Sequence, residues 1–301
     1  MDLRQLEYII AVADHGTFTK AAVAMHVSQP SLSNGVRNLE SELGVELFKR
    51  LGRTVRLTSA GEQVVHAGRR VIRDVADLTT VSRSVADIQT GQLDLVALPT
   101  LAVDPLAQLV GKFRTRFPGI TIHVGEPEDA SSIEREVSSG NAELGFTDIT
   151  TGGSGLARVE LFRQEVFAVC PPTTTLPDGP ITPDQLAALP LIATPPGTST
   201  RRLLDRVISR SQLDPSIAVQ IHFREAILPL VLAGAGIALL PAPMAHDAKT
   251  RGAVVRSLRP AVTRRIGVVH RPGLLSPAAT AMLRLSKKHK PPRSLPNQVE
   301  K

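Results

Sequence analysis

The sequence is poor in cysteine and in large aromatic residues. Its 301 residues include one cysteine, one tyrosine and no tryptophan. A single cysteine excludes an internal disulfide and a zinc cage built from cysteines. The eight histidines show no metal-ligand spacing, and neither paired carboxylates nor a nucleophile beside a base stands out. We therefore expect a protein that is not an enzyme and that holds neither a metal ion nor another cofactor.

An export signal and a membrane span are not expected either. Residues 1–5 have neither the basic region nor the apolar region of a secretory signal, which predicts a cytoplasmic location. The uncharged run from Ala226 to Ala245 reaches the length of a membrane helix, about 20 residues. Prolines and glycines interrupt it repeatedly, so a short helix, a glycine turn and a buried parallel strand explain it better.

The length and the charge distribution set the remaining limits. With 301 residues, 42% of them hydrophobic, the chain can form two domains with proper cores. The formal net charge is +7, but residues 284–301 alone carry +5 (six basic, one acidic), which leaves +2 for the rest. Residues 291–301 are expected to be a basic flexible tail. The net charge therefore does not by itself establish nucleic-acid binding.

Three helices are predicted in the first 43 residues. Gly16 suits the C-cap of the first helix, Thr17 or Thr19 can cap the second, and Ser28 can cap the third. Within the third, apolar residues at positions 32, 36, 39 and 43 face a core. Two helices joined by a short turn, the second opening with small polar residues, are typical of a helix-turn-helix.

Residues 48–58 alternate charged and apolar groups around Gly52. This pattern predicts a two-stranded basic wing, in which Arg50 and Arg53 can hold DNA phosphates beside a helix in the groove. An ordinary exposed hairpin is the alternative.

Five ordered motifs resemble the N-terminal domain of LysR-type transcriptional regulators. They are Phe18-Thr19-Lys20-Ala21-Ala22, Val27-Ser28-Gln29-Pro30-Ser31-Leu32-Ser33, Leu39-Glu40, Glu42-Leu43-Gly44-Val45-Glu46-Leu47-Phe48 and Leu57-Thr58-Ser59-Ala60-Gly61. The resemblance implies that the Ser-Gln-Pro segment opens a recognition helix in the major groove of double-stranded DNA. The residues expected to contact DNA are Thr19, Ser28, Gln29, Pro30, Ser31, Ser33, Asn34, Arg37, Arg50 and Arg53.

The sequence departs from many relatives at Asn34-Gly35, where they have a basic residue followed by a helix former. A glycine inside a helix costs about 1 kcal/mol relative to alanine. Asn34 can pair with an adenine edge, whereas arginine prefers guanine, so the operator sequence cannot be copied from a relative.

Residues 59–90 are predicted to form a dimerising linker helix and a hinge. No proline occurs between Ser59 and Ile88, and Val64, Val71, Leu78 and Val85 recur every seven residues. The alternative is a single amphipathic helix packed on its own domain. The family resemblance implies dimerisation through this helix and a homotetramer of two dimers.

After residue 91 strands alternate with helices, which predicts an α/β region. The resemblance implies two subdomains like those of periplasmic binding proteins, joined by crossing strands near residues 165–169 and 264–268. We expect a winged helix-turn-helix domain at 1–58, the linker helix at 59–90 and an effector-binding domain at 91–290. Its subdomain I comprises about 91–163 and 266–290, and subdomain II about 164–265.

Candidate effector contacts lie where strands end and helices begin, since open α/β sheets bind ligands at that edge. They are Pro99, Thr100, Thr147, Thr198, Ser199 and Phe223. Hydroxyls and free amides at helix starts favour a small carboxylate or similar anion. The alternative at Thr198 and Ser199 is simple capping of a helix.

These observations predict a sequence-specific DNA-binding transcriptional regulator whose activity is modulated by a small effector held between two subdomains. A constitutive DNA-binding protein, whose C-terminal domain is only an oligomerisation scaffold, is the alternative. Some members of the family sense peroxide through two cysteines. With Cys170 alone no internal disulfide switch can form; sulfenylation or an intersubunit disulfide stays open, and a small core residue is the favoured interpretation.

Overall fold

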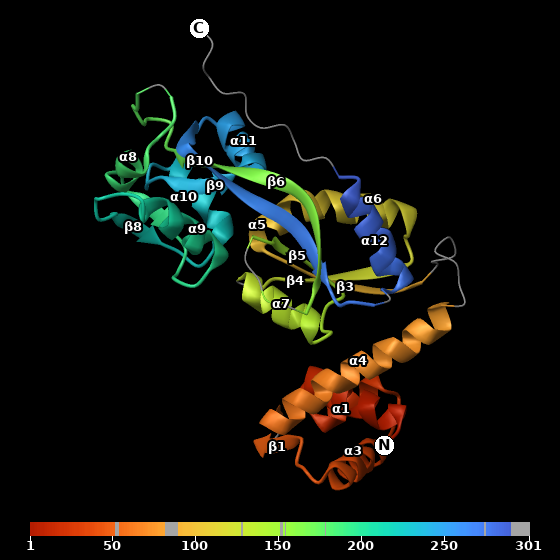
Figure 1. Cartoon of the computed structure of the whole chain (residues 1–301). Helices are drawn as coiled ribbons and strands as arrows, with labels where there is room; N and C mark the ends of the chain where they lie inside the picture. Colours follow the sequence, from red (N-terminus) through yellow and green to blue (C-terminus); the bar gives the residue numbers. More distant parts are fainter. Residues whose placement is uncertain are drawn as a thin grey trace.

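The computed structural model describes residues 1–51, 54–81, 90–127, 129–150, 153, 155–177, 179–273 and 275–289. A helical N-terminal region is followed by a larger region of strands and helices (Figure 1). Within the described ranges, no helix combines the length and the apolar character needed to cross a membrane.

The N-terminal region is a winged helix-turn-helix, as predicted. Its elements are α1 (Leu3–His15), α2 (Phe18–Ala24), α3 (Gln29–Leu43), β1 (Phe48–Leu51) and β2 (Thr54–Leu57). Thr17, not Thr19, caps α2 by accepting a hydrogen bond from the Lys20 amide at 3.2 Å. Ser28 caps α3 through the Ser31 amide at 3.3 Å. Gly16 and Gly44 end α1 and α3 in the left-handed conformation that glycine adopts readily.

Helix α4 (Ser59–Val81) packs against the helix-turn-helix along one face. Gly61 permits the closest approach, because a Cβ there would lie 2.0 Å from the Leu47 carbonyl oxygen. Val65 is buried in the same core, whereas Val71 is exposed on another face. The predicted repeat position Val85 lies outside the described residues, so the full seven-residue repeat is not seen.

The α/β region is built on a six-stranded mixed sheet in the order β4-β3-β5-β10-β6-β9. Its strands are β3 (Gly91–Ala97), β4 (Ile120–Gly125), β5 (Leu144–Asp148), β6 (Ala157–Cys170), β9 (Ala238–Pro241) and β10 (Val254–His270). Strands β4, β3 and β5 are parallel, and β10 runs antiparallel to both β5 and β6. The carboxyl ends of β3 and β5 therefore lie at one edge, next to the crossing strand β10.

One α/β unit, called unit I, surrounds β3, β4 and β5. Its helices are α5 (Pro99–Leu101), α6 (Ala107–Arg116), α7 (Ala130–Ser138) and α12 (Pro277–Lys287), with a π-turn, η2, at Ala102–Leu106. The predicted helix from residue 105 begins later, since Asp104 has extended backbone angles (φ −152°, ψ 124°). The unit I core combines residues from 93 to 162 with residues from 266 to 283, so the chain returns to complete it.

A second unit, unit II, contains α8 (Pro183–Ala187), β7 (Leu191–Ala193), α9 (Ser199–Ile208), β8 (Ile217–Gln220), η3 (Arg224–Ala226), α10 (Ile227–Leu232), β9 and α11 (Ala242–Thr250). Two apolar clusters form its core. The uncharged run from Ala226 folds as a short helix, a glycine turn and the buried strand β9, as predicted. However, β9 pairs with β6 in the antiparallel direction, so the expectation of a parallel strand was wrong.

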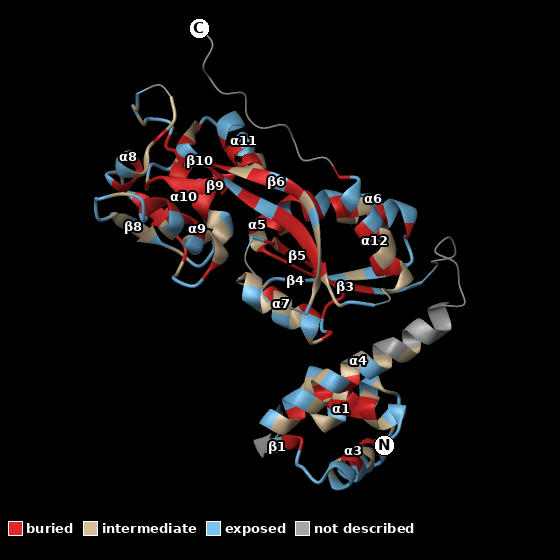
Figure 2. Cartoon of the chain, viewed as in Figure 1, coloured by how far each residue is buried: buried red, intermediate tan, exposed pale blue. Residues whose placement is uncertain are grey.

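Strands β6 and β10 pass through both units as neighbouring antiparallel strands (Figure 1). Their pairing is interrupted between Ser257 and Val262 and resumes on the other side. Buried residues line most of both strands (Figure 2). The prediction of two crossing strands is confirmed, although each is much longer than its apolar segment suggested.

Candidate functional site

The N-terminal half of α3 presents an exposed polar surface. Gln29, Pro30, Ser31, Asn34 and Arg37 are exposed, while Leu32, Val36 and Leu39 face the core. Such a helix, free on one face and held by its apolar stripe on the other, has the form of a recognition helix. Thr19 is also exposed, on the preceding helix α2.

Ser33 differs from the other predicted DNA contacts. It is only 5% exposed, because it lies on the inner side of α3 beside Leu32 and Val36. Its surroundings form a groove lined also by Phe18 and Phe48. The surface of α3 that is free to meet DNA therefore excludes Ser33, and the expectation for this residue needs correction.

The wing carries basic residues, although not only those singled out from the sequence. Arg53 lies outside the described residues, and for Arg50 the structure places the backbone in β1 without describing the side chain. Lys49 and Arg56 are exposed and stand opposite each other in the β1–β2 ladder. Their positions two residues either side of the turn region could have been recognised from the alternation of the hairpin.

Gly35 allows α3 to pack closely on α1. A Cβ at this position would lie 2.6 Å from Tyr8 Cδ2 and 2.9 Å from Tyr8 Cε2. Tyr8 is buried, so its ring cannot move aside freely. This contact explains why the recognition helix contains a glycine in spite of its low helix propensity.

In the α/β region, two predicted effector contacts join a buried polar cluster at the crossing strands. Thr100 begins α5 after β3, and Thr147 lies near the end of β5. Arg264 of β10 donates from Nη2 to Thr100 Oγ1 at 3.1 Å and also to Gln164 Oε1. Gln164 is the direct partner of Arg264 in the β6–β10 ladder. Thr100, Thr147, Gln164 and Arg264, called the hinge cluster below, are all buried.

Sequence reasoning missed Gln164 and Arg264. They sit 100 residues apart on strands whose register is fixed only by the folded sheet. A charged residue between buried neighbours in an apolar strand was the available signal, and Val262 and Ile266 flank Arg264 in this way.

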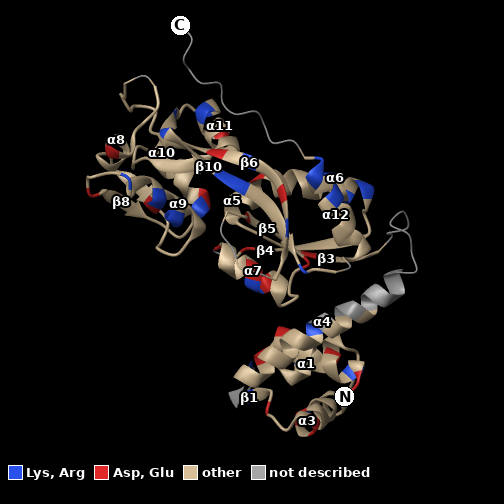
Figure 3. Ribbon diagram, in the orientation of Figure 1, with Lys and Arg blue, Asp and Glu red and all other residues tan. Residues whose placement is uncertain are grey.

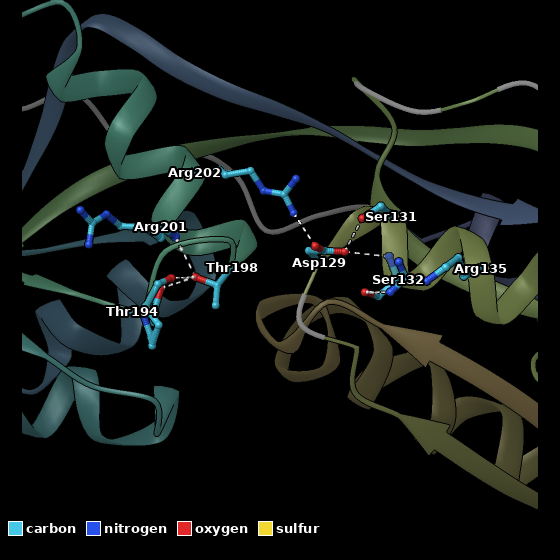
Figure 4. Close-up of polar contacts among 9 residues, drawn as sticks. Asp129, Ser131, Ser132, Arg135, Thr194, Thr198, Arg201 and Arg202 are labelled. Atoms are coloured by element: carbon cyan, nitrogen blue, oxygen red, sulfur yellow. Dashed lines mark hydrogen bonds and ion pairs between the residues drawn. The ribbon is translucent and has the colours of Figure 1, made fainter. Parts of the chain in front are cut away.

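The starts of helices α7 and α9 provide the second polar group (Figure 4). Thr198 is the N-cap of α9: its hydroxyl accepts from the Arg201 amide at 3.2 Å, donates to the Pro195 carbonyl at 2.9 Å and lies 2.6 Å from Thr194 Oγ1. Its hydrogen-bonding capacity is thus used within the chain, which matches the capping alternative. Ser199 is half-buried in the first turn.

Asp129 links the two units. It caps α7 by accepting from the Ser132 amide at 2.7 Å and the Ser131 hydroxyl at 2.8 Å, and it pairs with Arg202 of α9 at 3.0 Å. Figure 4 shows Arg202 extending from α9 toward this carboxylate. Burial raises the pKa of Asp129, but the two serine hydrogen bonds and the charge of Arg202 outweigh burial and hold the pKa at about 2.

A second ion pair joins the units nearby. Arg224 Nη1 in η3 lies 3.5 Å from Glu126 Oε1, which follows β4. Figure 3 shows further basic residues along α9, at the same face of unit II. The two units therefore contact through opposite charges, with the cations of both pairs on unit II and the carboxylates on unit I.

The remaining predicted effector contacts are not gathered into either polar group by the contacts of the described residues. Phe223 is 68% exposed before η3, and Pro99 is half-buried at the start of α5. A large apolar side chain as exposed as Phe223 has few neighbours within its own chain.

Cys170 lies inside the core of unit II, fully buried. Burial raises the pKa of its thiol to about 11, with Arg256 opposing the shift. A thiol in this state forms little thiolate at neutral pH, which agrees with a packing role. Within the described ranges, no group of three or more histidine, cysteine or acidic residues is arranged to hold a metal ion.

Comparison with known proteins gives matches over nearly the whole chain. Residues 3–62 match the model of the bacterial regulatory helix-turn-helix protein, lysR family, and residues 86–291 match that of the LysR substrate binding domain. The transcriptional activator protein LysR of Escherichia coli K12 is 27% identical over 276 residues, covering 90% of this chain and 88% of that protein. The DNA-binding transcriptional dual regulator OxyR of the same strain is 29% identical over 284 residues, covering 91% and 90%. A full-length OxyR variant from Pseudomonas aeruginosa has the same fold, with a TM-score of 0.77 and 22% identity over 96% of this chain and 99% of that one.

Proposed function

Because the chain belongs to the LysR family of transcriptional regulators, we propose that a small carboxylate or similar anion, held between units I and II, controls how its winged helix-turn-helix engages DNA. The protein regulates by binding and not by catalysis, and it acts in the cytoplasm, where it meets DNA. The proposal includes the domain limits 1–58, 59–90 and 91–290.

The observation that carries the effector class is the environment of Asp129. Donors from the start of α7 and Arg202 from α9 already hold a carboxylate between the two units, with a pKa of about 2. An effector carboxylate can be stabilised by the same kinds of donor, because helix starts and guanidinium groups favour negative charge.

The connection between the units provides the mechanism. The crossing strands β6 and β10 are continuous through both units, and the pairs Arg202–Asp129 and Arg224–Glu126 span them. An effector that binds one arrangement of the units better than another shifts the population toward it. The linker helix α4 carries the change to paired DNA-binding domains. Dimerisation through α4, with Val71 exposed for the contact, and assembly into a homotetramer are parts of the proposal.

For DNA recognition, we propose base contacts by the exposed residues at the start of α3 and phosphate contacts by the wing. The base-reading residues are Gln29, Pro30, Ser31, Asn34 and Arg37, with Thr19 and Ser28 beside them. Arg50 and Arg53 were proposed from the sequence, and Lys49 and Arg56 join them because both are exposed on the wing.

Footprinting on the DNA upstream of the protein's own gene tests this function. We expect a protected region that shortens or shifts when one of a panel of small carboxylic acids is added. Gln29→Ala should reduce the preference for this DNA over random DNA, whereas Lys49→Ala should weaken both and lower the salt dependence by about one unit of slope. No protection above random DNA would refute the function. Protection that no acid alters would favour the constitutive alternative.

A further inference from the structure

The hinge cluster contains polar atoms whose hydrogen bonds are not made within the chain. Thr147 Oγ1, Gln164 Nε2 and Arg264 Nε are buried and have no hydrogen-bond partner. Thr147 is 0% exposed, and Gln164 and Arg264 are each 4% exposed. Buried polar atoms are paired in the great majority of cases, so three unpaired atoms in one cluster need an explanation.

All three unpaired atoms can donate. Arg264 has donors only, so the atom of Gln164 that faces it must be the carbonyl Oε1, and the amide Nε2 is left as the free end. Arg264 Nε carries a hydrogen, and the Thr147 hydroxyl can donate as well as accept. The missing partner is therefore a group that accepts several hydrogen bonds. A carboxylate accepts up to about four and donates none, whereas a water brings two donors of its own.

The cluster also lacks a negative charge. None of the carboxylates described forms an ion pair with Arg264, although it is a buried guanidinium. Asp148 acts on it electrostatically, but its Oδ1 is held by Thr150. Burial lowers the pKa of Arg264 to about 10, so the group stays cationic at neutral pH. A buried cation without a counter-ion is costly, and a bound anion removes that cost.

The position of the cluster connects this charge to the movement of the units. Arg264 and Gln164 are opposite each other on the two crossing strands, and Thr100 and Thr147 belong to strand ends of unit I. An anion bound here would contact the strands that join the units at their common edge.

We propose that Thr147, Gln164 and Arg264 form the recognition site for the carboxylate group of the effector, with Arg264 as the residue that selects an anion. This inference rests on the proposed function and names the residues that would carry it. It assigns the site to unused donors at the crossing strands, whereas Thr198, whose hydroxyl is already bonded, acts only as a helix cap.

The test measures thermal unfolding of the full chain with the sodium salts of formate, acetate, benzoate and succinate, each against sodium chloride at equal ionic strength. At least one carboxylate should raise the melting temperature in a saturable manner, since a ligand that binds only the folded state stabilises it. Sodium sulfate serves as an inorganic anion. Stabilisation by sulfate alone, or by none of the carboxylates, would overturn the proposal.

Arg264→Met removes the charge and keeps the length of the side chain, so the buried site stays filled. It should weaken the stabilising carboxylate about 10- to 100-fold, as expected for loss of a charged hydrogen-bonding partner. Arg163→Met is the matched control, because Arg163 is an exposed neighbour of Gln164 on β6. Equal affinity in Arg264→Met and the unmodified protein would overturn the proposal.

Thr147→Val supplies a second test that does not depend on loss of folding. Its hydroxyl has no partner in the free protein, so valine should raise the melting temperature without ligand and still weaken carboxylate binding. Thr263→Val, at an exposed position of β10, is the control. A lower melting temperature for free Thr147→Val, or unchanged carboxylate binding, would contradict the site.

Footprinting of the same variants separates this inference from the proposed function. If Arg264→Met still binds the upstream DNA but no longer responds to the acid, both stand. If it responds as before, the site is wrong while the regulator remains. If the unmodified protein protects no specific DNA, the function fails regardless of the carboxylate result.

Discussion

Replacing Gly35 with alanine should destabilise the DNA-binding domain, although alanine is the better helix former. The helix propensity alone would add about 1 kcal/mol of stability. Against this, the new Cβ would lie 2.6 Å from a ring carbon of buried Tyr8. Overpacking of this kind costs about 1–3 kcal/mol. We expect a net loss of up to about 2 kcal/mol, together with weaker specific DNA binding because α3 must shift.

Tyr8 also provides the assay. It is the single tyrosine of a chain without tryptophan, so tyrosine fluorescence during urea unfolding reports the DNA-binding domain alone. Far-UV circular dichroism then follows Gly35→Ala in a Tyr8→Leu background, where the clash is relieved and alanine should stabilise by about 1 kcal/mol. Gly111→Ala is the control, since nothing lies within 4 Å of a Cβ there. If Gly35→Ala stabilises the unmodified background as Gly111→Ala does, the packing argument is refuted.

Three further predictions concern other parts of the chain. Iodoacetamide at pH 8 should label Cys170 only after unfolding, because its thiol is buried with a pKa of about 11; rapid labelling of the native protein, seen by mass spectrometry, would contradict this. Gly61→Ala should cost about 3 kcal/mol or more of stability, since its Cβ would meet the Leu47 carbonyl oxygen at 2.0 Å and the backbone must move; unchanged urea unfolding would show otherwise. Asp129→Asn should lose about 1–2 kcal/mol above pH 4, discounted for partial exposure. The folded-state pKa of Asp129, about 2, lies below its ordinary value of 3.8, so the stabilisation is complete above pH 3.8, disappears as the pH falls toward 2, and should bring the two thermal melting curves together there.

The features that could be read from the sequence are those set by neighbouring residues. Caps at Ser28 and Gly16, the basic hairpin and the succession of strands and helices all depend on local patterns, and the structure contains them. The family motifs between Phe18 and Gly61 also depend on local order, and the match over residues 3–62 confirms them.

Features that depend on packing between distant segments could not be read in the same way. Ser33 has the composition of a DNA-contacting residue, but the rotation of α3 against its core places it inside. Gln164 and Arg264 become partners only through the register of β6 and β10. The crossing strands were underestimated because their exposed ends alternate polar and apolar residues, which hides their continuation beyond the apolar segments.

The return of β10 to unit I affects how the chain is made on the ribosome. Unit II is one continuous segment, whereas the unit I core needs residues 266–283 in addition to residues near 93–162. During synthesis, β5 has no neighbour on one side until β10 emerges, and the apolar surface that α12 covers stays open until almost the end. Unit I, although translated first, must therefore finish folding last, and its unpaired strand edge is the part of the nascent chain most exposed to aggregation.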